Sequence, residues 1–340
     1  MTKQPNKASI TKNPSDLKFT TVKGQAGLHK LSRHHGRYDF SSMVSLTPEL
    51  KQHIVTNPHG ESSINFSDPI AVKLLNKSLL AISYGVTYWD IPSGYLCPPV
   101  PGRADYIHRL AELLGKDQPR LEHNQVRALD IGVGANCIYP IVGVRQYGWY
   151  YIGSDIDPVS IENANQIVSR NPVLAGRIDC RLQPRRDAFF TNIIRSGERY
   201  DVTTCNPPFH QSFEDAQQGT TRKLNNLSRN RYQRGQKSQK METKASPILN
   251  FGGQHSELWC PGGEAEFVKN LVKESQDFSD QVLWFSTLIS KKDNVRWMRK
   301  NLERVGAKEA QVIEMKQGQK VSRFVAWTFQ TRSERQNWRR

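Results

Sequence analysis

At 340 residues the chain is long enough for one large core or two unequal domains, and it is strongly basic. Its 48 Lys and Arg residues against 32 acidic residues give a formal charge of +16, which favours a polyanionic partner, because binding to phosphates releases counterions. Five scattered cysteines without a CxxC pair argue against a zinc cluster or disulfide framework, and no apolar run approaches the roughly 18 residues that cross a bilayer. We therefore expect a cytoplasmic protein with no metal and no membrane partner.

Residues 1–40 are predicted to be a flexible basic arm. They contain eight Lys or Arg residues against two acidic residues, and few apolar residues. Such a composition buries too little apolar surface to offset the entropy of ordering, and it could become ordered on a nucleic acid. A terminus that only increases solubility explains the same composition equally well.

Residues 41–102 are predicted to form a helical extension followed by a proline-rich entrance loop. Asp68 and Pro69 are typical of a helix start, and apolar residues then recur at helical spacing until Gly85. The prolines between positions 91 and 102 exclude a continuous helix, because proline lacks the N–H group and restricts the residue before it.

Residues 103–330 are predicted to form one α/β domain, which begins with a helix from about Arg103 to Leu114 that Gly115 ends. Alternating strand and helix patterns then predict parallel βαβ units, with the last two strands forming an antiparallel hairpin around Gly318. The expected fold is a Rossmann-like, seven-stranded, mostly parallel sheet, followed by a basic tail at 331–340. The strands are expected at 126–131, 150–155, 178–182, 200–205, 281–289, 311–315 and 324–329.

A basic insertion interrupts this alternation at residues 217–246. It carries eight Lys or Arg residues against a single acidic residue, and it is rich in Gln, Asn and Ser. We expect an exposed segment that binds the phosphates of a nucleic acid. The candidate contacts are Arg222, Lys223, Arg229 and Arg231.

A glycine-rich turn follows the first strand of the domain, with Asp130, Gly132 and Gly134 in sequence. Glycines at this edge of a parallel sheet allow a ligand to approach the backbone closely. Cys137 replaces the third glycine of GxGxxG, and no GKS or GKT follows, which weakens the dinucleotide and P-loop interpretations. Asp155 ends the next strand, where a carboxylate can accept both hydroxyl protons of a ribose.

The most specific motif is Asn206-Pro207-Pro208-Phe209, directly after the fourth strand. The amide oxygen of Asn206 and the carbonyl of Pro207 could accept both N–H bonds of an amino group on a ring, directing its lone pair at a methyl donor. Paired prolines hold the loop rigid, and Phe209 could stack on the base. A rigid loop beside a core phenylalanine is the structural alternative.

With this motif the chain resembles the bacterial large-subunit ribosomal RNA adenine N6-methyltransferases, whose relatives include the eukaryotic methyltransferase-like sixteen proteins. The resemblance covers roughly residues 40–330 and includes five landmarks in order: the proline-rich segment at 98–107, the glycine turn at 132–134, the motif at 206–209, and the segments at 262–268 and 324–329. It implies a class I fold that uses S-adenosyl-L-methionine to methylate N6 of an adenine. The implied substrate is 23S ribosomal RNA or a large-subunit assembly intermediate.

The resemblance also implies roles for individual residues. Asp130, Gly132, Gly134 and Asp155 would face the cofactor, whereas Asn206, Pro207, Pro208 and Phe209 would hold the adenine. Arg103 resembles a substrate or cofactor-pocket residue, with a surface ion pair as the equal alternative. Gln183 or Asp187 would reach the adenine of the cofactor, and Glu264 would support the site from the start of a helix.

Three other functions share parts of this pattern. A guanine N2-methyltransferase of ribosomal RNA is barely separable by the motif. A protein glutamine N5-methyltransferase uses the same kind of loop, because an amide nitrogen is equally conjugated, although the basic segments argue against it. A non-enzymatic RNA-binding module is the third alternative, and it would not explain the glycine turn, Asp155 or the Asn-Pro-Pro-Phe motif.

Overall fold

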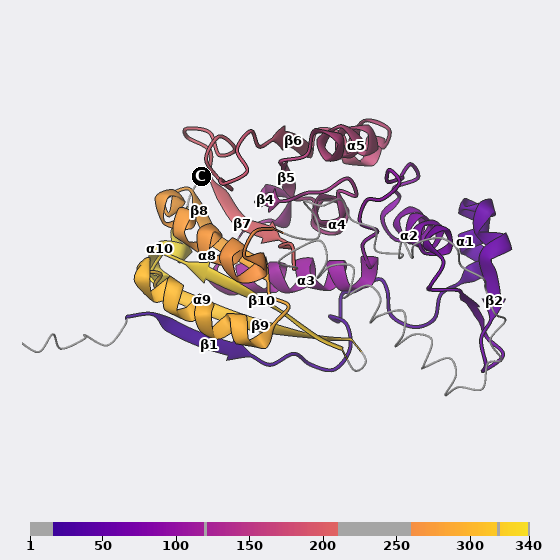
Figure 1. Ribbon diagram of the computed structural model, residues 1–340, viewed down its shortest axis with the longest axis horizontal. Helices are drawn as coiled ribbons and strands as arrows, with labels where there is room; N and C mark the ends of the chain where they lie inside the picture. The colour runs from indigo at the N-terminus through magenta and orange to yellow at the C-terminus, as the bar shows by residue number, and fades with distance from the viewer. Residues whose placement is uncertain (1–15, 119–120, 210–259, 318–319, 339–340) are drawn as a thin grey trace, which may run out of the picture.

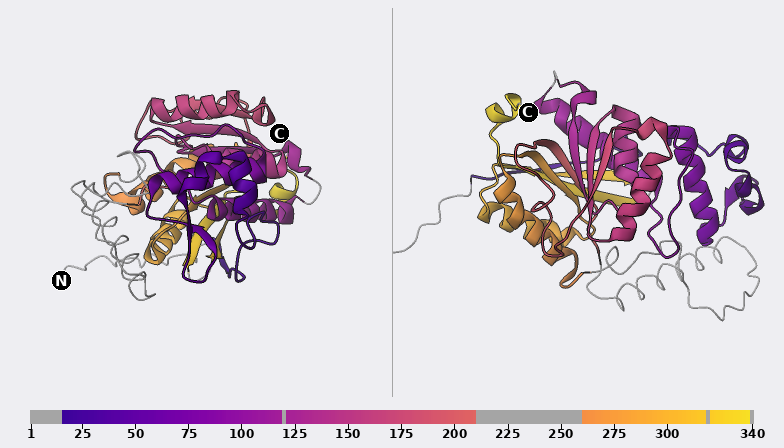
Figure 2. Two further views of the ribbon diagram at one scale, coloured as in Figure 1. Left: turned by 90° about the vertical axis from the view of Figure 1, so that its right-hand side faces the viewer. Right: turned by 90° about the horizontal axis from the view of Figure 1, so that it is seen from above.

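The computed structural model describes residues 16–118, 121–209, 260–317 and 320–338. They form one eight-stranded sheet in the order β1-β9-β10-β8-β7-β4-β5-β6, with helices on both of its faces (Figures 1 and 2). Apolar side chains of α3, α4 and α5 form a core on one face, and those of α8 and α9 form a second core on the other. Within the described ranges, no helix is both long and apolar enough to cross a membrane.

The predicted α/β architecture is confirmed. The strands β4 to β8 pair in parallel, and β10 runs antiparallel to both β8 and β9, as the predicted terminal hairpin requires. Each predicted strand is present with small changes at its ends. The strands of this part are β4 (Arg127–Ile131), β5 (Tyr150–Asp155), β6 (Ile178–Leu182), β7 (Tyr200–Cys205), β8 (Val282–Leu288), β9 (Glu309–Gln317) and β10 (Lys320–Thr328).

The prediction of a flexible arm at 1–40 is wrong for residues 16–40, which are folded, whereas residues 1–15 lie outside the described part. Strand β1 (Lys18–Val22) pairs in parallel with β9 and adds an eighth strand to the expected seven. It covers backbone groups of β9 that would otherwise form an open edge. Leu17 is buried beneath it, so a short apolar segment within a polar stretch is enough to anchor this strand.

The N-terminal extension contains two elements that the sequence pattern did not predict, the short strands of a β-hairpin. Asp68 caps α2 through the N–H of Ile70, and Gly85 ends it in the left-handed conformation, both as predicted. The described elements are α1 (Phe40–Leu46), β2 (Ile54–Thr56), β3 (Ser62–Ile64) and α2 (Pro69–Tyr84).

Helix α3 (Val100–Asp117) is longer than predicted at both ends. It begins inside the segment that was expected to be a loop, because Pro101 lies in the first turn, where its missing N–H costs no hydrogen bond. At the other end it continues through Gly115 to Asp117 rather than ending at the glycine. The boundary expected at 102/103 therefore falls within a helix that belongs to the domain.

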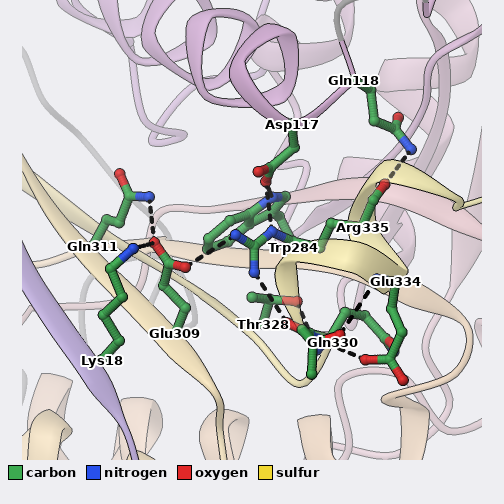
Figure 3. Close-up of polar contacts among 11 residues, drawn as sticks. Lys18, Asp117, Gln118, Trp284, Glu309, Gln311, Thr328, Gln330, Glu334 and Arg335 are labelled. Atoms are coloured by element: carbon green, nitrogen blue, oxygen red, sulfur yellow. Dashed lines mark hydrogen bonds and ion pairs between the residues drawn. The ribbon is translucent and has the colours of Figure 1, made fainter.

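The residues expected to form a basic tail at 331–340 include helix α10 (Arg332–Gln336), whose Arg335 is buried. The guanidinium of Arg335 donates to Asp117 at 2.8 Å and to Glu309 at 3.0 Å, and it lies over the ring of Trp284 (Figure 3). Glu309 also accepts from Lys18 at 3.1 Å. One buried cation thus joins α10 to α3 and β9, and Glu309 extends the network to β1.

Replacing Arg335 should destabilise the fold severely. Arg335→Ala leaves the buried carboxylates of Asp117 and Glu309 without their main cation, a loss that typically costs about 3–5 kcal/mol. Arg332→Ala on the same helix is the matched control, because Arg332 is exposed and should change the free energy of unfolding by less than about 0.5 kcal/mol. Urea denaturation measures both. Equal effects of the two substitutions would show that the buried network does not stabilise the fold.

Candidate active site

A pocket lies where the loops after β4, β5, β6 and β7 meet, at the carboxyl ends of these parallel strands. Half of the predicted site residues line it, although they are spread over more than 100 positions of the sequence. The predicted residues that line it are Arg103, Gly132, Gly134, Asp155, Gln183, Asn206 and Pro208.

The glycine turn is held against the end of β5 by its own backbone. The N–H groups of Gly132 and Val133 both donate to the carbonyl of Ser154, at 2.8 and 2.9 Å. Gly132 and Gly134 have φ angles of +76° and +60°, in the left-handed region that glycine adopts readily. The residue type at these positions therefore determines the shape of this wall of the pocket.

Asp155 ends β5 at the pocket and organises two backbone segments. Its carboxylate accepts the N–H of Gly134 at 2.9 Å and that of Asp157 at 3.0 Å. Burial raises the pKa of Asp155 to about 6, and the two backbone donors oppose that rise. Asp157 caps α5 (Pro158–Ser169) through Val159 and Ser160, as its position before a proline predicts.

Asp130 lies behind the pocket and does not line it. The hydroxyl of Thr204 donates to its carboxylate at 2.8 Å, which ties β4 to β7. Burial raises the pKa of Asp130 well above its usual range, and one carboxylate oxygen has no partner among the described residues. In the structure this side chain connects the two central strands, β4 and β7. The predicted direct contact between Asp130 and the cofactor stays a prediction.

A three-residue network connects the motif at 206–209 to two helices. Arg103 on α3 donates to the amide oxygen of Asn206 at 2.9 Å and to the hydroxyl of Tyr139 at 2.7 Å. Its guanidinium also lies over the Tyr139 ring, 5.6 Å from the centroid. Tyr139 belongs to α4 (Ile138–Tyr147), and it was missed because its helical spacing is typical of a core residue. The network fixes the orientation of the Asn206 amide.

The two prolines of the motif are buried, whereas Asn206 and Phe209 are half-buried. Neither Pro207 nor Phe209 is among the residues that line the pocket, so the motif presents Asn206 and Pro208 to it. Contact of Phe209 with a substrate base stays a prediction.

Gln183 lines the pocket from the loop after β6, and its amide groups order that loop. It accepts from the N–H of Arg185 at 3.0 Å and donates to the carbonyl of Thr191 at 2.8 Å. Glu274, which the sequence analysis missed, accepts three backbone N–H groups of the same loop, from residues 189–191. This loop also places Phe189 in the pocket wall.

Helix α8 (Gly263–Ser275) begins within the segment 262–268, after Gly262 at its N-cap. Glu264 in its first turn is buried and accepts from the hydroxyl of Ser290 at 2.8 Å, and it also bonds the Asn294 side chain. It therefore connects α8 to the start of α9 (Lys292–Arg304) and does not line the pocket, and its predicted support of the site stays a prediction.

The predicted phosphate contacts Arg222, Lys223, Arg229 and Arg231, with the whole insertion at 217–246, lie outside the described residues. Within the described ranges, no group of three or more His, Cys, Asp or Glu residues is arranged to hold a metal ion.

Comparison with known proteins identifies the family. Residues 22–331 match the family described as "RNA methyltransferase". The chain belongs to this family. It is 58% identical to "Ribosomal RNA large subunit methyltransferase F" of Vibrio cholerae serotype O1 (strain M66-2), over 99% of this chain and 92% of that protein. It is 48% identical to the protein of the same name from Ectopseudomonas mendocina (strain ymp), over 99% and 98% of the two chains.

Solved structures agree with this assignment. The catalytic domain of hMettl16 in complex with MAT2A 3′UTR hairpin 1 is 30% identical, with a TM-score of 0.70 over 89% of this chain and 96% of that one. The N-terminal domain of human METTL16 in complex with SAH is 27% identical, with a TM-score of 0.68 over 90% and 100%. The predicted resemblance and the class I methyltransferase fold are confirmed, and S-adenosylmethionine is the cofactor of this family member.

The pKa of Asp155 predicts that cofactor binding weakens in mild acid. If the Asp155 carboxylate accepts the ribose hydroxyls, protonation below its pKa of about 6 removes that acceptor. The Kd for S-adenosylhomocysteine should then rise by about tenfold between pH 7.5 and pH 5 in calorimetric titrations. Asp155→Asn should bind weakly with little change over this range. A variant that keeps the wild-type pH dependence would contradict the assignment to Asp155.

Proposed function

We propose that this protein transfers a methyl group from S-adenosylmethionine to the exocyclic N6 of an adenine in the 23S ribosomal RNA of the large subunit. The names of the bacterial relatives support the ribosomal substrate, at 58% identity for one of them. The observation that carries the chemistry is the Asn206 amide oxygen, which Arg103 fixes at 2.9 Å in the same pocket as the glycine turn.

The reacting nitrogen of an adenine is a poor nucleophile, because its lone pair is delocalised into the ring. A carbonyl oxygen has two lone pairs, so the Asn206 amide can accept from Arg103 and from one substrate N–H together. The backbone carbonyl of Pro207 would accept the second N–H. With both N–H bonds held, the nitrogen becomes more pyramidal and its lone pair is directed away from the ring.

The acceptors must already be in place when the substrate arrives, because reorganisation during the reaction would raise the barrier. Buried Pro207 and Pro208 restrict the backbone of the loop, and Arg103 restricts the side chain of Asn206. Because a lone pair attacks, no side chain has to remove a proton before the transfer.

The pocket residues fit the cofactor. S-adenosylmethionine supplies an electrophilic methyl group on its sulfonium. We assign Asp155 to its ribose hydroxyls, because its carboxylate lines the pocket at the end of β5. Gly132 and Gly134 admit the ligand close to the backbone, and an added Cβ at Gly132 would meet no atom within 4 Å. Gln183 belongs to the part of the pocket wall that the loop after β6 forms, and it would contact the adenine of the cofactor.

The target adenine must be unpaired or flipped out to reach such a pocket. Phe209 would stack on it. The basic insertion at 217–246 would bind RNA phosphates, which positions the RNA without selecting its sequence. The substrate is 23S ribosomal RNA or an assembly intermediate of the large subunit, which would place the enzyme in the cytoplasm.

The competing assignments also explain the motif, but the comparisons with known proteins do not support them. Guanine N2-methylation and glutamine N5-methylation would use the same pair of acceptors. The relatives are named for ribosomal RNA of the large subunit, and a neighbour was solved with an RNA hairpin, which favours RNA over a protein substrate.

Removal of the Asn206 acceptor should slow turnover strongly and preserve cofactor binding. In Asn206→Ala we expect kcat for methylation of ribosomal RNA to fall by about 100-fold or more, as for the loss of one preorganised hydrogen-bonding group. Single-turnover assays with labelled S-adenosylmethionine measure the rate, and calorimetry measures the Kd for S-adenosylhomocysteine. Asn165→Ala, at an exposed position of α5, is the control. A near wild-type rate in Asn206→Ala would disprove the acceptor mechanism.

Deletion of residues 217–246 should weaken RNA binding and reduce its dependence on salt. The segment carries eight Lys or Arg residues, and each phosphate contact on a single strand contributes about 0.7 to the slope of log Kd against log salt concentration. Filter binding of an unmodified 23S transcript at several salt concentrations gives this slope. An unchanged slope would show that the insertion does not bind phosphates.

A further inference from the structure

Helix α9 (Lys292–Arg304) presents a basic outer face that the reaction chemistry does not use. Figure 1 shows it on the outside of the sheet, beside β1 and α8. Met298 and Leu302 are buried and hold one side of the helix on the core. The opposite side is exposed at Arg296, Trp297 and Lys300. Lys300 follows Trp297 by three residues and Arg296 by four, so it is a neighbour of both on the helix surface.

Trp297 is the most exposed large apolar side chain in the described part of the chain, with 60% of its surface accessible. The amine of Lys300 lies 5.1 Å from the centroid of its ring. An isolated exposed apolar residue is common, but an exposed indole with a lysine amine over its ring, on a helix rich in cations, has the composition of a platform for nucleic-acid bases.

The charge of this face is strongly unbalanced. Of its two acidic residues, Glu303 accepts from Arg299 at 3.1 Å, which leaves Asp293 as the other carboxylate. The remaining exposed charges of this region are all cationic, at Lys291, Lys292, Arg296, Lys300 and Arg304. The phosphates of a nucleic acid complement such a surface along their whole length. A protein partner would instead need a row of carboxylates that matches these cations.

The helix begins at the same edge of the sheet as the pocket. It follows β8, which is parallel to β7, so both strands end on the side where Asn206 lies. The carboxylate of Glu264 joins α8 to the start of α9. Glu264 belongs to the first turn of α8, and it accepts a hydrogen bond from Ser290, just before α9. Phe267, one turn further along α8, lines the pocket.

We propose that the outer face of α9 is a docking surface for an unpaired segment of the RNA substrate, with a base stacked on Trp297 and phosphates bound by Arg296 and Lys300. This inference rests on the proposed function, since it names a second contact for the same RNA. The base in the pocket and the base on α9 belong to one strand that crosses the start of the helix.

The test compares substitutions on α9 with matched substitutions at the opposite edge of the sheet. Trp297→Ala should raise the Kd for an unmodified 23S ribosomal RNA transcript by about tenfold, the effect of losing one stacked base, and Trp297→Phe should restore most of the affinity. The control is Tyr150→Ala. Tyr150 is an exposed aromatic residue at the start of β5 that also lies under a cation, Arg177.

The charged contact has its own matched pair. Lys300→Gln should lower the slope of log Kd against log salt concentration by about 0.7. Lys116→Gln, at the end of α3, removes the same charge and should leave the slope unchanged. The Kd for S-adenosylhomocysteine and the midpoint of thermal unfolding should stay at wild-type values in all variants, which separates loss of RNA contact from misfolding.

The possible results are distinct. Equal RNA affinity of the wild type and Trp297→Ala would overturn the surface and leave the proposed reaction intact. Tight RNA binding that Trp297→Ala loses, without any N6-methyladenosine formed by the wild type, would support the surface and overturn the reaction. If Trp297→Ala changes the oligomeric state in light scattering and not the RNA affinity, the face binds a second copy of the chain, and the inference is wrong.

Discussion

The site depends on the parallel pairing of β7, β4, β5 and β6. Because these strands run in one direction in register, their carboxyl ends meet at one edge, with Ile131 opposite both Ser154 and Cys205. The residues that end the strands or follow them are thereby brought together, although they are far apart in the sequence. Gly132, Asp155, Gln183 and Asn206 share a pocket for this reason. Helices pack on both faces of the sheet, and the buried Arg335 network joins α10 to α3 and β9.

The parts of the fold that the sequence predicted are those with a strong local signal. Buried parallel strands are runs of apolar residues, and glycine or the pair of prolines marks the loops that follow them. The strand β1 was missed because five residues in a polar stretch pair with a strand almost 300 positions away. The role of Arg335 was missed for the same reason, since its partner Asp117 is 218 positions distant. Tyr139 and Glu274 act across elements, and neither belongs to a motif that would distinguish it from an ordinary helix residue.

Electrostatics divides the molecule into two regions. Burial raises the pKa values of Asp155 at the pocket and of Asp130 behind it, and the cation of Arg103 is directed onto the neutral amide of Asn206. Much of the net charge of +16 comes from two segments, the exposed face of α9 and the sequence at 217–246. We infer a division of labour in which surface cations hold the RNA backbone and neutral acceptors orient the reacting nitrogen. This arrangement keeps phosphate binding separate from the choice of base.

The identity of the methylated nucleoside tests the central claim most directly. The protein is incubated with methyl-labelled S-adenosylmethionine and unmodified 23S ribosomal RNA, and the RNA is then digested to nucleosides and analysed by mass spectrometry. The account predicts label in N6-methyladenosine. Label in N2-methylguanosine would preserve the fold and the pocket but contradict the base assignment, and label found only in added ribosomal protein would contradict the RNA substrate altogether.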